Sequence, residues 1–306
     1  MQTYILKRLL QAIPVLFIVT LIVFSLLHFL PGCPAANILG EEATGAQIER
    51  LRETMGLNRP IYIQYLEWVG GILRGDFGTS LRDGREVFPT LMRRLPATLH
   101  LVLASLFIST LIGIPVGVIS AVRQNSLLDS FSRVFALLGV SIPNFWLGLM
   151  LILLFSYHLG WLPASGRGTL AHLIMPSIAL GTASAGLITR LTRSSMLEVI
   201  RTDFIRTARS KGLIERRVIY GHALKNALLP VTTIVGLQMG YRLGGSLITE
   251  AVFAYPGIGH FTYERLLARD MPVVMGNLFL FALMFILINL LTDITYGFLD
   301  PRIRYD

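Results

Sequence analysis

Apolar residues are concentrated in six long stretches, which more polar segments separate. An apolar helix of roughly 20 residues crosses a hydrocarbon core of about 30 Å, and each stretch is about that long. The pattern therefore predicts six membrane-spanning helices, near residues 9–30, 98–122, 134–157, 172–191, 228–248 and 277–299. The fourth stretch is the weakest, because small and hydroxyl residues such as Ser177, Gly181 and Thr182 dilute it.

Basic residues near the ends of these stretches fall on alternate turns of the chain. Lys and Arg that flank a span are retained on the cytoplasmic side of a membrane. The basic groups are Lys7 and Arg8, Arg123 and Arg133, the positions between 190 and 225, and Arg302 and Arg304. All four groups share one side if the chain crosses six times, so we expect an all-α membrane protein with both termini in the cytoplasm.

Residues 190–230 form a basic island between the fourth and fifth predicted spans. The island carries nine Lys and Arg residues against three acids, a net charge of +6 in a chain whose formal charge is +9. It is also helix-prone, with residues 203–211 and 215–225 reading as two short helical pieces on either side of Gly212. We expect Gly212 to act as a hinge, because glycine adopts a positive φ without steric cost. Such a loop is more typical of a docking surface than of a simple connector.

The segment between the first two spans contains an amphipathic pattern. Apolar and aromatic residues recur at helical spacing from Tyr62 to Leu73, Pro60 precedes them, and glycines loosen the end. The pattern predicts a helix that lies on the outer membrane surface or packs on the spans. We divide the chain accordingly into residues 1–96, with the first span and this segment, and a core of five spans over 97–299 with a cytoplasmic loop at 192–228.

The composition agrees with a membrane protein and not with a soluble or nucleic-acid-binding one. Of 306 residues 53% are hydrophobic and only 15% charged, too few charges to cover a soluble surface. The basic residues lie beside apolar spans and not among exposed aromatics. Lys7 and Arg8 before an apolar run resemble a secretory signal, and residues 30–33 loosely resemble a lipoprotein cleavage box at Cys33, the one cysteine. Because the run exceeds the 7–15 residues of a signal-peptide core, we interpret it as a retained signal-anchor helix.

Sequence patterns for catalysis or for metal binding are absent. There is no glycine-rich phosphate loop with its lysine, so nucleotide hydrolysis would need another chain. The six histidines are scattered and have no metal-ligand spacing, and no serine lies in a nucleophile motif. We therefore expect a non-catalytic subunit without metal or cofactor.

Two features stand out inside the predicted spans. Arg242 lies in the fifth span, where a charged residue is costly; it either snorkels to the outer surface or lines a water-filled path. Gly236, Gly240 and Gly244 lie four residues apart on one face of the same span. This spacing favours close helix packing over a smooth pore wall. In the last span, Asn289 and Asp293 share a face and are expected to hydrogen-bond to other helices.

The basic island also resembles a family motif. Arg206, Thr207 and Ala208, followed after three residues by Gly212, resemble the EAA loop of ABC importer permeases, in the branch that carries dipeptides, oligopeptides, nickel and glutathione. The resemblance covers nearly the whole chain through LPGCP at 30–34, GLNRP at 56–60, GDFGTS at 75–80, LPATL at 95–99, SIPNFWLG at 141–148, HALKNALLP at 222–230, EAVFAYPGIG at 250–259, RDMP at 269–272 and DPR at 300–302. The order and spacing of these motifs are together specific.

The resemblance implies the type I ABC importer permease fold in the bacterial inner membrane. It also implies four partners besides membrane lipid: a second similar permease, two ATP-binding cassette ATPase subunits and an extracytoplasmic substrate-binding protein. The contact with the ATPases would involve residues 206–224, from Arg206 to Leu224. Here Arg206 replaces the first Glu of the general EAA pattern and Lys225 its closing Pro. Cys33 and Arg242 also depart from the relatives, which usually carry Asp and an apolar residue there.

The substrate stays open at this point. Permeases of this branch receive cargo from a binding protein and need little selectivity themselves. Peptide is our first expectation, with a nickel chelate or glutathione as alternatives. A stand-alone channel or secondary transporter would want a polar relay across several spans or inverted repeats with broken helices, and neither is visible in the sequence. A membrane-embedded enzyme lacks its catalytic groups.

Overall fold

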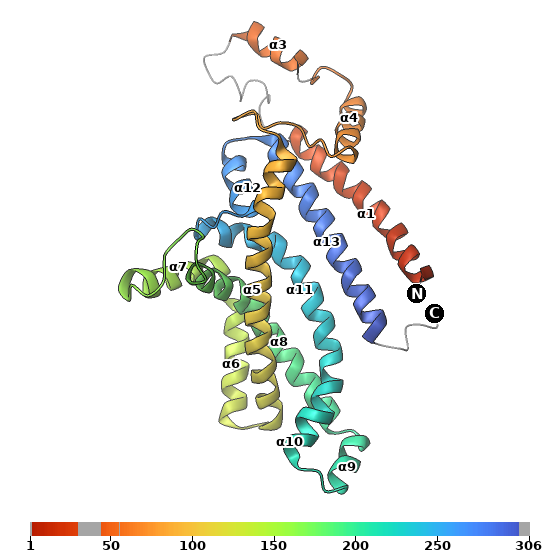
Figure 1. Cartoon of the computed structure of the whole chain (residues 1–306), viewed down its shortest axis with the longest axis vertical. Coiled ribbons are helices and arrows are strands. Elements are labelled where there is room, and N and C mark those ends of the chain that lie inside the picture. The colour runs from red at the N-terminus through yellow and green to blue at the C-terminus, as the bar shows by residue number, and fades with distance from the viewer. Residues whose placement is uncertain (1, 30–43, 55, 300–306) are drawn as a thin grey trace. The chain divides into compact units, whose positions relative to one another are not determined.

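The computed structural model describes residues 2–29, 44–54 and 56–299. Cys33, the motifs at 30–34 and 300–302, and the pair Arg302 and Arg304 lie outside these residues. So does the side chain of Asp293, although its backbone is helical. Nearly all regular structure in the described residues is helical (Figure 1): α1 Gln2–Phe29, α3 Gly45–Thr54, α4 Ile61–Leu73, α5 Val87–Val122, α6 Leu127–Ser141, α7 Asn144–Leu151, η1 Ile152–His158, α8 Ala171–Ile200, α9 Asp203–Ser210, α10 Glu215–Arg217, η2 Val218–Ala223, α11 Leu224–Val252, α12 Ile258–Leu267 and α13 Met271–Leu299.

Four described helices are long and apolar enough to cross a membrane. They are Lys7–Leu26 within α1, Val87–Val122, Ala171–Ile200 and Met271–Thr292 within α13. The pair formed by α6 and by α7 with η1 counts as a fifth candidate if a bent pair is one span. Helix α11 is a continuous helix of 29 residues over the fifth predicted span, but its glycines and polar residues keep it below this level of apolarity.

The third predicted span is not one straight helix, which corrects the sequence interpretation. Its two halves are bent by 103° at a break between Ser141 and Asn144. The cause is Pro143, whose ring forces the preceding residue out of the helical region. Ile142 is accordingly extended, with φ −78° and ψ 124°.

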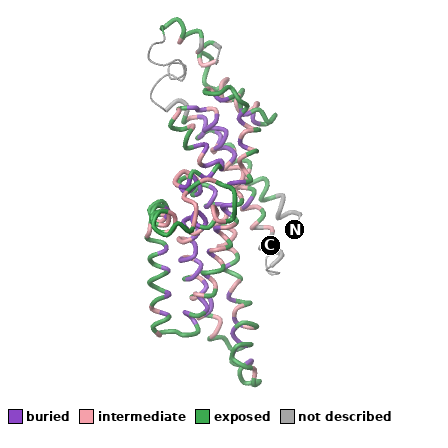
Figure 2. The backbone as a smooth tube through the Cα atoms, turned by 60° about the vertical axis from the view of Figure 1, so that its left-hand side comes forward, coloured by how far each residue is buried: buried purple, intermediate pink, exposed green. Residues whose placement is uncertain are grey.

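Large apolar side chains are exposed along much of the helical surface. Phe107, Phe131 and Leu137 are among many that are more than half exposed, and Figure 2 shows exposed residues along the outer faces of the helices. Contiguous exposed apolar surface is unusual for a soluble monomer. It is what lipid-facing helices require.

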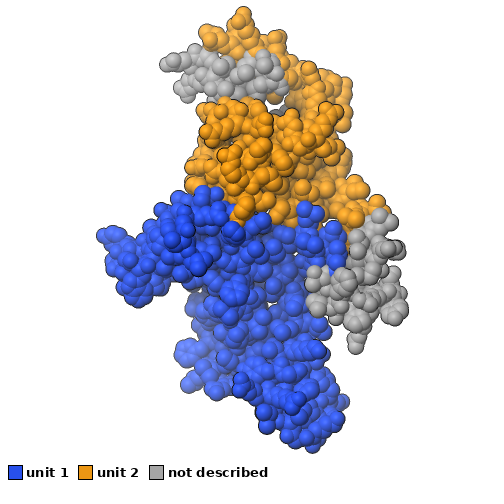
Figure 3. Space-filling model, viewed as in Figure 1, with its two compact units in different colours: residues 1, 97–256, 287–306 blue, residues 2–96, 257–286 orange. Residues whose placement is uncertain are grey.

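The chain forms two compact units, which Figure 3 colours separately. Among the described residues, one unit comprises those within 2–96 and 257–286, and the other comprises those within 97–256 and 287–299. Helices α5 and α13 contribute residues to both.

In the first of these units, α4 confirms the predicted amphipathic helix. Ile72 is buried in a core with Phe77, Leu91 and Phe279. Another side of α4 packs on α1, where the Tyr65 hydroxyl lies 2.8 Å from Thr20 Oγ1 and its ring meets Phe24 edge-on at 5.4 Å. The helix therefore packs on a predicted span, one of the two expected placements.

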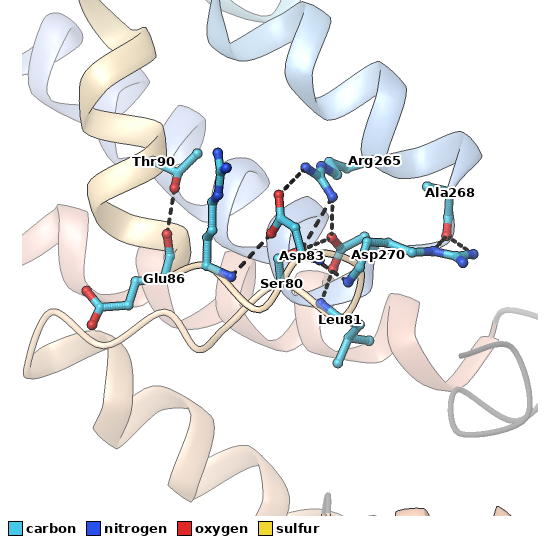
Figure 4. Close-up of polar contacts among 10 residues, drawn as sticks. Ser80, Leu81, Asp83, Glu86, Thr90, Arg265, Ala268 and Asp270 are labelled. Carbon is cyan, nitrogen blue, oxygen red and sulfur yellow. Dashed lines mark hydrogen bonds and ion pairs between the residues drawn. The ribbon is translucent and has the colours of Figure 1, made fainter. Parts of the chain in front are cut away.

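A buried polar network ties two distant segments of this unit together (Figure 4). Asp270 is fully buried and accepts hydrogen bonds from Ser80 Oγ at 2.6 Å and from the Leu81 N–H at 3.0 Å. Arg265 lies 3.3 Å from Asp270 and donates to Asp83 at 2.7 Å. The network joins the GDFGTS and RDMP motifs.

In the second unit, α8 is the central helix and packs against α11, α6 and α7. Its small residues, which weakened the fourth predicted span, are the packing surface. A Cβ atom on Gly181 would lie 2.9 Å from the Ser105 carbonyl oxygen, and one on Gly186 would lie 2.5 Å from the Ala136 carbonyl oxygen. Only glycine lets the helices approach this closely.

A buried ion pair fastens α6 to α8. Asp129 is fully buried and accepts two hydrogen bonds from Arg193, at 2.7 and 2.9 Å, and a third from Ser120 Oγ at 2.6 Å. The Asn125 N–H donates a fourth at 3.0 Å. Arg193 belongs to the last two turns of α8, which are also the first part of the basic island.

Candidate functional site

Residues 203–224 have the two-piece structure that the sequence predicts. Helix α9, Asp203–Ser210, is followed by a turn, by α10, Glu215–Arg217, and by the π-helical turn η2, Val218–Ala223, which runs into α11. The segment lies at one end of the helices of its unit (Figure 1). We call residues 203–224 the loop segment.

The loop segment is anchored by an apolar core of its own. Ile205 and Ala208 are the buried residues of α9. They cluster with Val218 and Ile219 of the loop segment itself and with Met196 of α8. The cluster also includes Val118 and Ala121 of α5 and Ala227 of α11, so the segment is attached to three long helices at once. A force applied to it would reach these helices without passing through a flexible linker.

Gly212 has the predicted positive φ, at 73°. It follows α9 as a C-terminal capping glycine, and its N–H donates to the Arg209 carbonyl at 2.9 Å. No atom lies within 4 Å of the place where a Cβ would be. The requirement for glycine is therefore one of backbone conformation and not of space.

A side-chain pair spans this turn. Arg209 donates to Glu215 through Nε at 3.1 Å and through Nη2 at 2.7 Å. The hydrogen bond from Arg209 holds the pKa of Glu215 below its usual value, against a smaller opposing effect of burial. The pair thus links α9 to α10 across Gly212.

The outer face of the loop segment combines basic and apolar side chains. Phe204, Ile214 and Tyr220 are exposed to 45%, 70% and 55%. The exposed basic residues around them are Arg206, Arg209, Lys211, Arg216 and Arg217. Exposed apolar groups on a rigid, charged surface are typical of a protein contact. The sequence analysis did not identify these three residues. Phe204 and Tyr220 lie off the buried faces of α9 and η2, and Ile214 directly precedes α10.

The five predicted contact residues occupy three different environments in the structure. Arg206 and Thr207 are exposed, whereas Ala208 is buried and Leu224 is half-buried against the apolar core. Gly212 sets the turn between the two helical pieces. Ala208 and Leu224 therefore hold the loop segment in place, and the exposed pair belongs to its outer face.

Arg242 is buried in the second unit. Its exposure is 3%, and Nη1 and Nη2 donate to Ser105 Oγ and Ser109 Oγ, both at 2.6 Å. The two serines lie one turn apart on α5. Snorkelling to an outer surface would require an exposed guanidinium, which this geometry does not have.

A cavity of about 290 Å³ lies beside Arg242. One face of α8 and one face of α11 line most of it, and the break between α6 and α7 contributes the rest. The lining residues are Val140, Asn144, Leu180, Ala183, Ser184, Leu187, Arg190, Gln238, Tyr241, Arg242 and Gly245.

The three glycines on α11 differ in their surroundings. A Cβ on Gly236 would overlap the side chain of Thr292, whereas one on Gly244 would meet nothing within 4 Å. Gly240 is buried. The lining of the cavity includes Gly245 and none of the three. Gly236 therefore shows the predicted close packing, and Gly244 does not.

Two family descriptions match the chain. Residues 113–305 match the binding-protein-dependent transport system inner membrane component, and residues 1–102 match the N-terminal part of such membrane components. The chain belongs to this permease family. The permease is 43% identical over 333 residues to the dipeptide transport system permease protein DppB of Alkalihalophilus pseudofirmus, and 43% identical over 305 residues to the glutathione transport system permease protein GsiC of Escherichia coli. Both alignments cover 100% of each chain.

Solved structures show the fold of the permease. The inward-facing MetNI methionine ABC transporter matches with a TM-score of 0.57 at 23% identity, over 69% of this chain and 96% of the other. An amino acid ABC transporter with histidines matches with a TM-score of 0.51 at 15% identity, over 70% and 94%. The fold is that of an ABC transporter permease.

These findings confirm the predicted family and its general role. The permease is a non-catalytic, multi-pass inner membrane subunit of a binding-protein-dependent ABC importer. Membership implies ATPase subunits and a binding protein as partners.

Proposed function

We propose that the permease forms half of the translocation path of a peptide importer, beside a second, similar permease. Two ATPase subunits would drive it through the loop segment. The observation that carries this proposal is the loop segment itself, whose apolar core is continuous with α5, α8 and α11 while its outer face presents Phe204, Ile214 and Tyr220. A rigid contact of this kind would transmit movement of the ATPase subunits to whole membrane-spanning helices.

We further infer six crossings with both termini in the cytoplasm. The four apolar helices, the bent pair α6–α7 and helix α11 would be the six. The basic residues of the loop segment support a cytoplasmic location, because such residues are retained on that side. A single cysteine at Ser210, in a chain without Cys33, should react with a membrane-impermeant maleimide only from the cytoplasmic face.

A short peptide is the substrate class that the relatives favour. One relative is named for dipeptide transport and another for glutathione transport, at the same 43% identity. Both cargoes carry free carboxylates. A nickel chelate remains the alternative that the sequence raises.

The contact is tested by placing a charge at its most exposed apolar residue. In the complete transporter, Ile214→Asp should lower substrate-stimulated ATPase activity about tenfold, with the permease still inserted in the membrane. Gly221→Ala is the matched control in the same segment, since the added Cβ makes only an ordinary 3.7 Å contact with Arg217. Normal stimulation in the Ile214→Asp transporter would contradict this contact.

A further inference from the structure

The guanidinium of Arg242 is buried among neutral partners. Ser105 and Ser109 accept from its two terminal nitrogens, and Nε is buried with no hydrogen-bond partner in the described residues. Among the ion pairs of the described residues, none includes Arg242. Burial of a cation without a counter-ion costs several kcal/mol. The arrangement is therefore unfavourable unless an anion comes to this place.

The two serines hold the guanidinium of Arg242 in a fixed position in which it could bind such an anion. Hydroxyl groups fix the orientation of the guanidinium but leave its positive charge uncompensated. A carboxylate would be held at Arg242 by charge-assisted hydrogen bonds, which are about twice as strong as neutral ones. A structural cation would instead be expected to have an acidic partner on a neighbouring helix, as Arg193 has in Asp129.

The cavity beside Arg242 has the matching character. Its lining includes a second cation, Arg190, and no Asp or Glu. Asn144, the first residue of α7, also lines it, at the point where the helix restarts after the Pro143 break. The N-terminus of α7 has no side-chain cap, and a half-helix N-terminus favours negative charge. Ser184, Gln238 and Tyr241 add neutral polar groups.

We propose that this cavity is a transient binding site for the carboxylate of the transported peptide, with Arg242 as its anchor. The proposal rests on the peptide import proposed above. The cavity volume of about 290 Å³ is at the lower end of the range for small-molecule sites, which suits the terminal residue of a short peptide. This site lies within the permease, whereas selection of the substrate by the binding protein is a separate, earlier step.

The test is direct binding to the transporter assembled from the permease and its partner subunits, without binding protein. The probes are dialanine, dialanine amide, which lacks the carboxylate, and N-acetyldialanine, which keeps the carboxylate and lacks the ammonium group. Wild-type transporter should bind dialanine and N-acetyldialanine at least tenfold more tightly than the amide. Equal binding of the acid and the amide, or binding of neither, overturns the proposal without any substitution.

Variants separate a binding role from a structural one. Arg242→Met should reduce the preference for the acid to less than twofold and keep or raise the thermal midpoint, since it removes an uncompensated buried cation. Arg242→Lys should keep part of the preference. Arg133→Met, at an exposed arginine outside the cavity, is the control and should keep all of it. Unchanged preference in Arg242→Met overturns the proposal.

Import measured separately distinguishes this inference from the proposed function. With binding protein supplied, a wild-type transporter that accumulates dialanine supports peptide import whatever the binding result. A transporter that imports no peptide contradicts the proposed function.

Discussion

Arg209 and Glu215 are joined by two hydrogen bonds, of 2.7 and 3.1 Å, across the left-handed turn at Gly212. This pair connects α9 to α10 on the exposed side of the turn. The loop segment is thereby fixed twice, by its apolar core beneath and by this pair above.

The Arg209–Glu215 pair gives the loop segment a defined pH dependence. The pKa of Glu215 is lowered in the folded protein from 4.5, so the pair stabilises the turn fully above about pH 4.5 and is lost as pH falls through the lowered pKa. Because the pair is exposed, we expect no more than about 0.5 kcal/mol. Hydrogen exchange of the backbone amides of residues 212–214 should be about twofold faster in Glu215→Gln than in the wild type at pH 7. This difference between the two proteins should stay constant between pH 6 and 8. A loss of the stabilisation near pH 7 would contradict this assignment.

The network around Asp270 should dominate the stability of the unit that contains residues 257–286. Asp270→Ala leaves Arg265 without its buried partner, and we expect a loss of about 3 kcal/mol. Asp83→Asn affects the more exposed end of the same network and should cost less than about 1 kcal/mol. Thermal unfolding of the purified transporter measures both losses. Equal losses would show that burial does not determine how much each carboxylate contributes to the free energy of unfolding.

The glycine face of α11 should respond unevenly to added methyl groups. Gly236→Ala forces the side chain of Thr292 to move and should cost about 1–3 kcal/mol. Gly244→Ala has free space and should be neutral or stabilising by up to about 1 kcal/mol. Adding Thr292→Ala to Gly236→Ala should recover most of the loss. The thermal midpoints of these three variants test the prediction, and destabilisation by Gly244→Ala would contradict the free space around Gly244.

The buried pair Asp129–Arg193 should show a large coupling energy. A double-mutant cycle with Asp129→Asn and Arg193→Met should give about 1.5–3 kcal/mol, the usual range for hydrogen bonds to charged groups. Arg133 also approaches Asp129, at 3.9 Å, but is 57% exposed. Arg133→Met should therefore cost no more than about 0.5 kcal/mol. A coupling energy near zero would mean that α6 is held on α8 by packing alone.

Local patterns predicted much of the helical framework. Apolar stretches gave the long helices, and helical spacing between Tyr62 and Leu73 gave α4. Charge and glycine placement gave the two pieces on either side of Gly212. Each of these features depends on residues that are neighbours in sequence, so each could be predicted from the sequence alone. The bend after Ser141 also had a local signal, the Ile142–Pro143 pair, which the length of the apolar run obscured.

Contacts between distant residues could not be predicted in this way. Arg242 meets serines 133 and 137 residues away, and Asp270 meets Ser80 across 190 residues. Nothing near Arg242 in the sequence distinguishes a buried guanidinium from a snorkelling one. Its surroundings depend on how α5 and α11 pack, which only the folded chain reveals.

The central claim is that the loop segment transmits ATP-driven motion, and Gly212 tests it most directly. The measurement is the number of ATP molecules hydrolysed per peptide imported by reconstituted transporter, for Gly212→Val and for its matched control Gly212→Asn. Valine disfavours a φ of 73°, whereas asparagine tolerates it. We predict that Gly212→Val inserts normally but hydrolyses at least tenfold more ATP per peptide, and that Gly212→Asn stays close to wild type. A Gly212→Val transporter with wild-type coupling would contradict the claim.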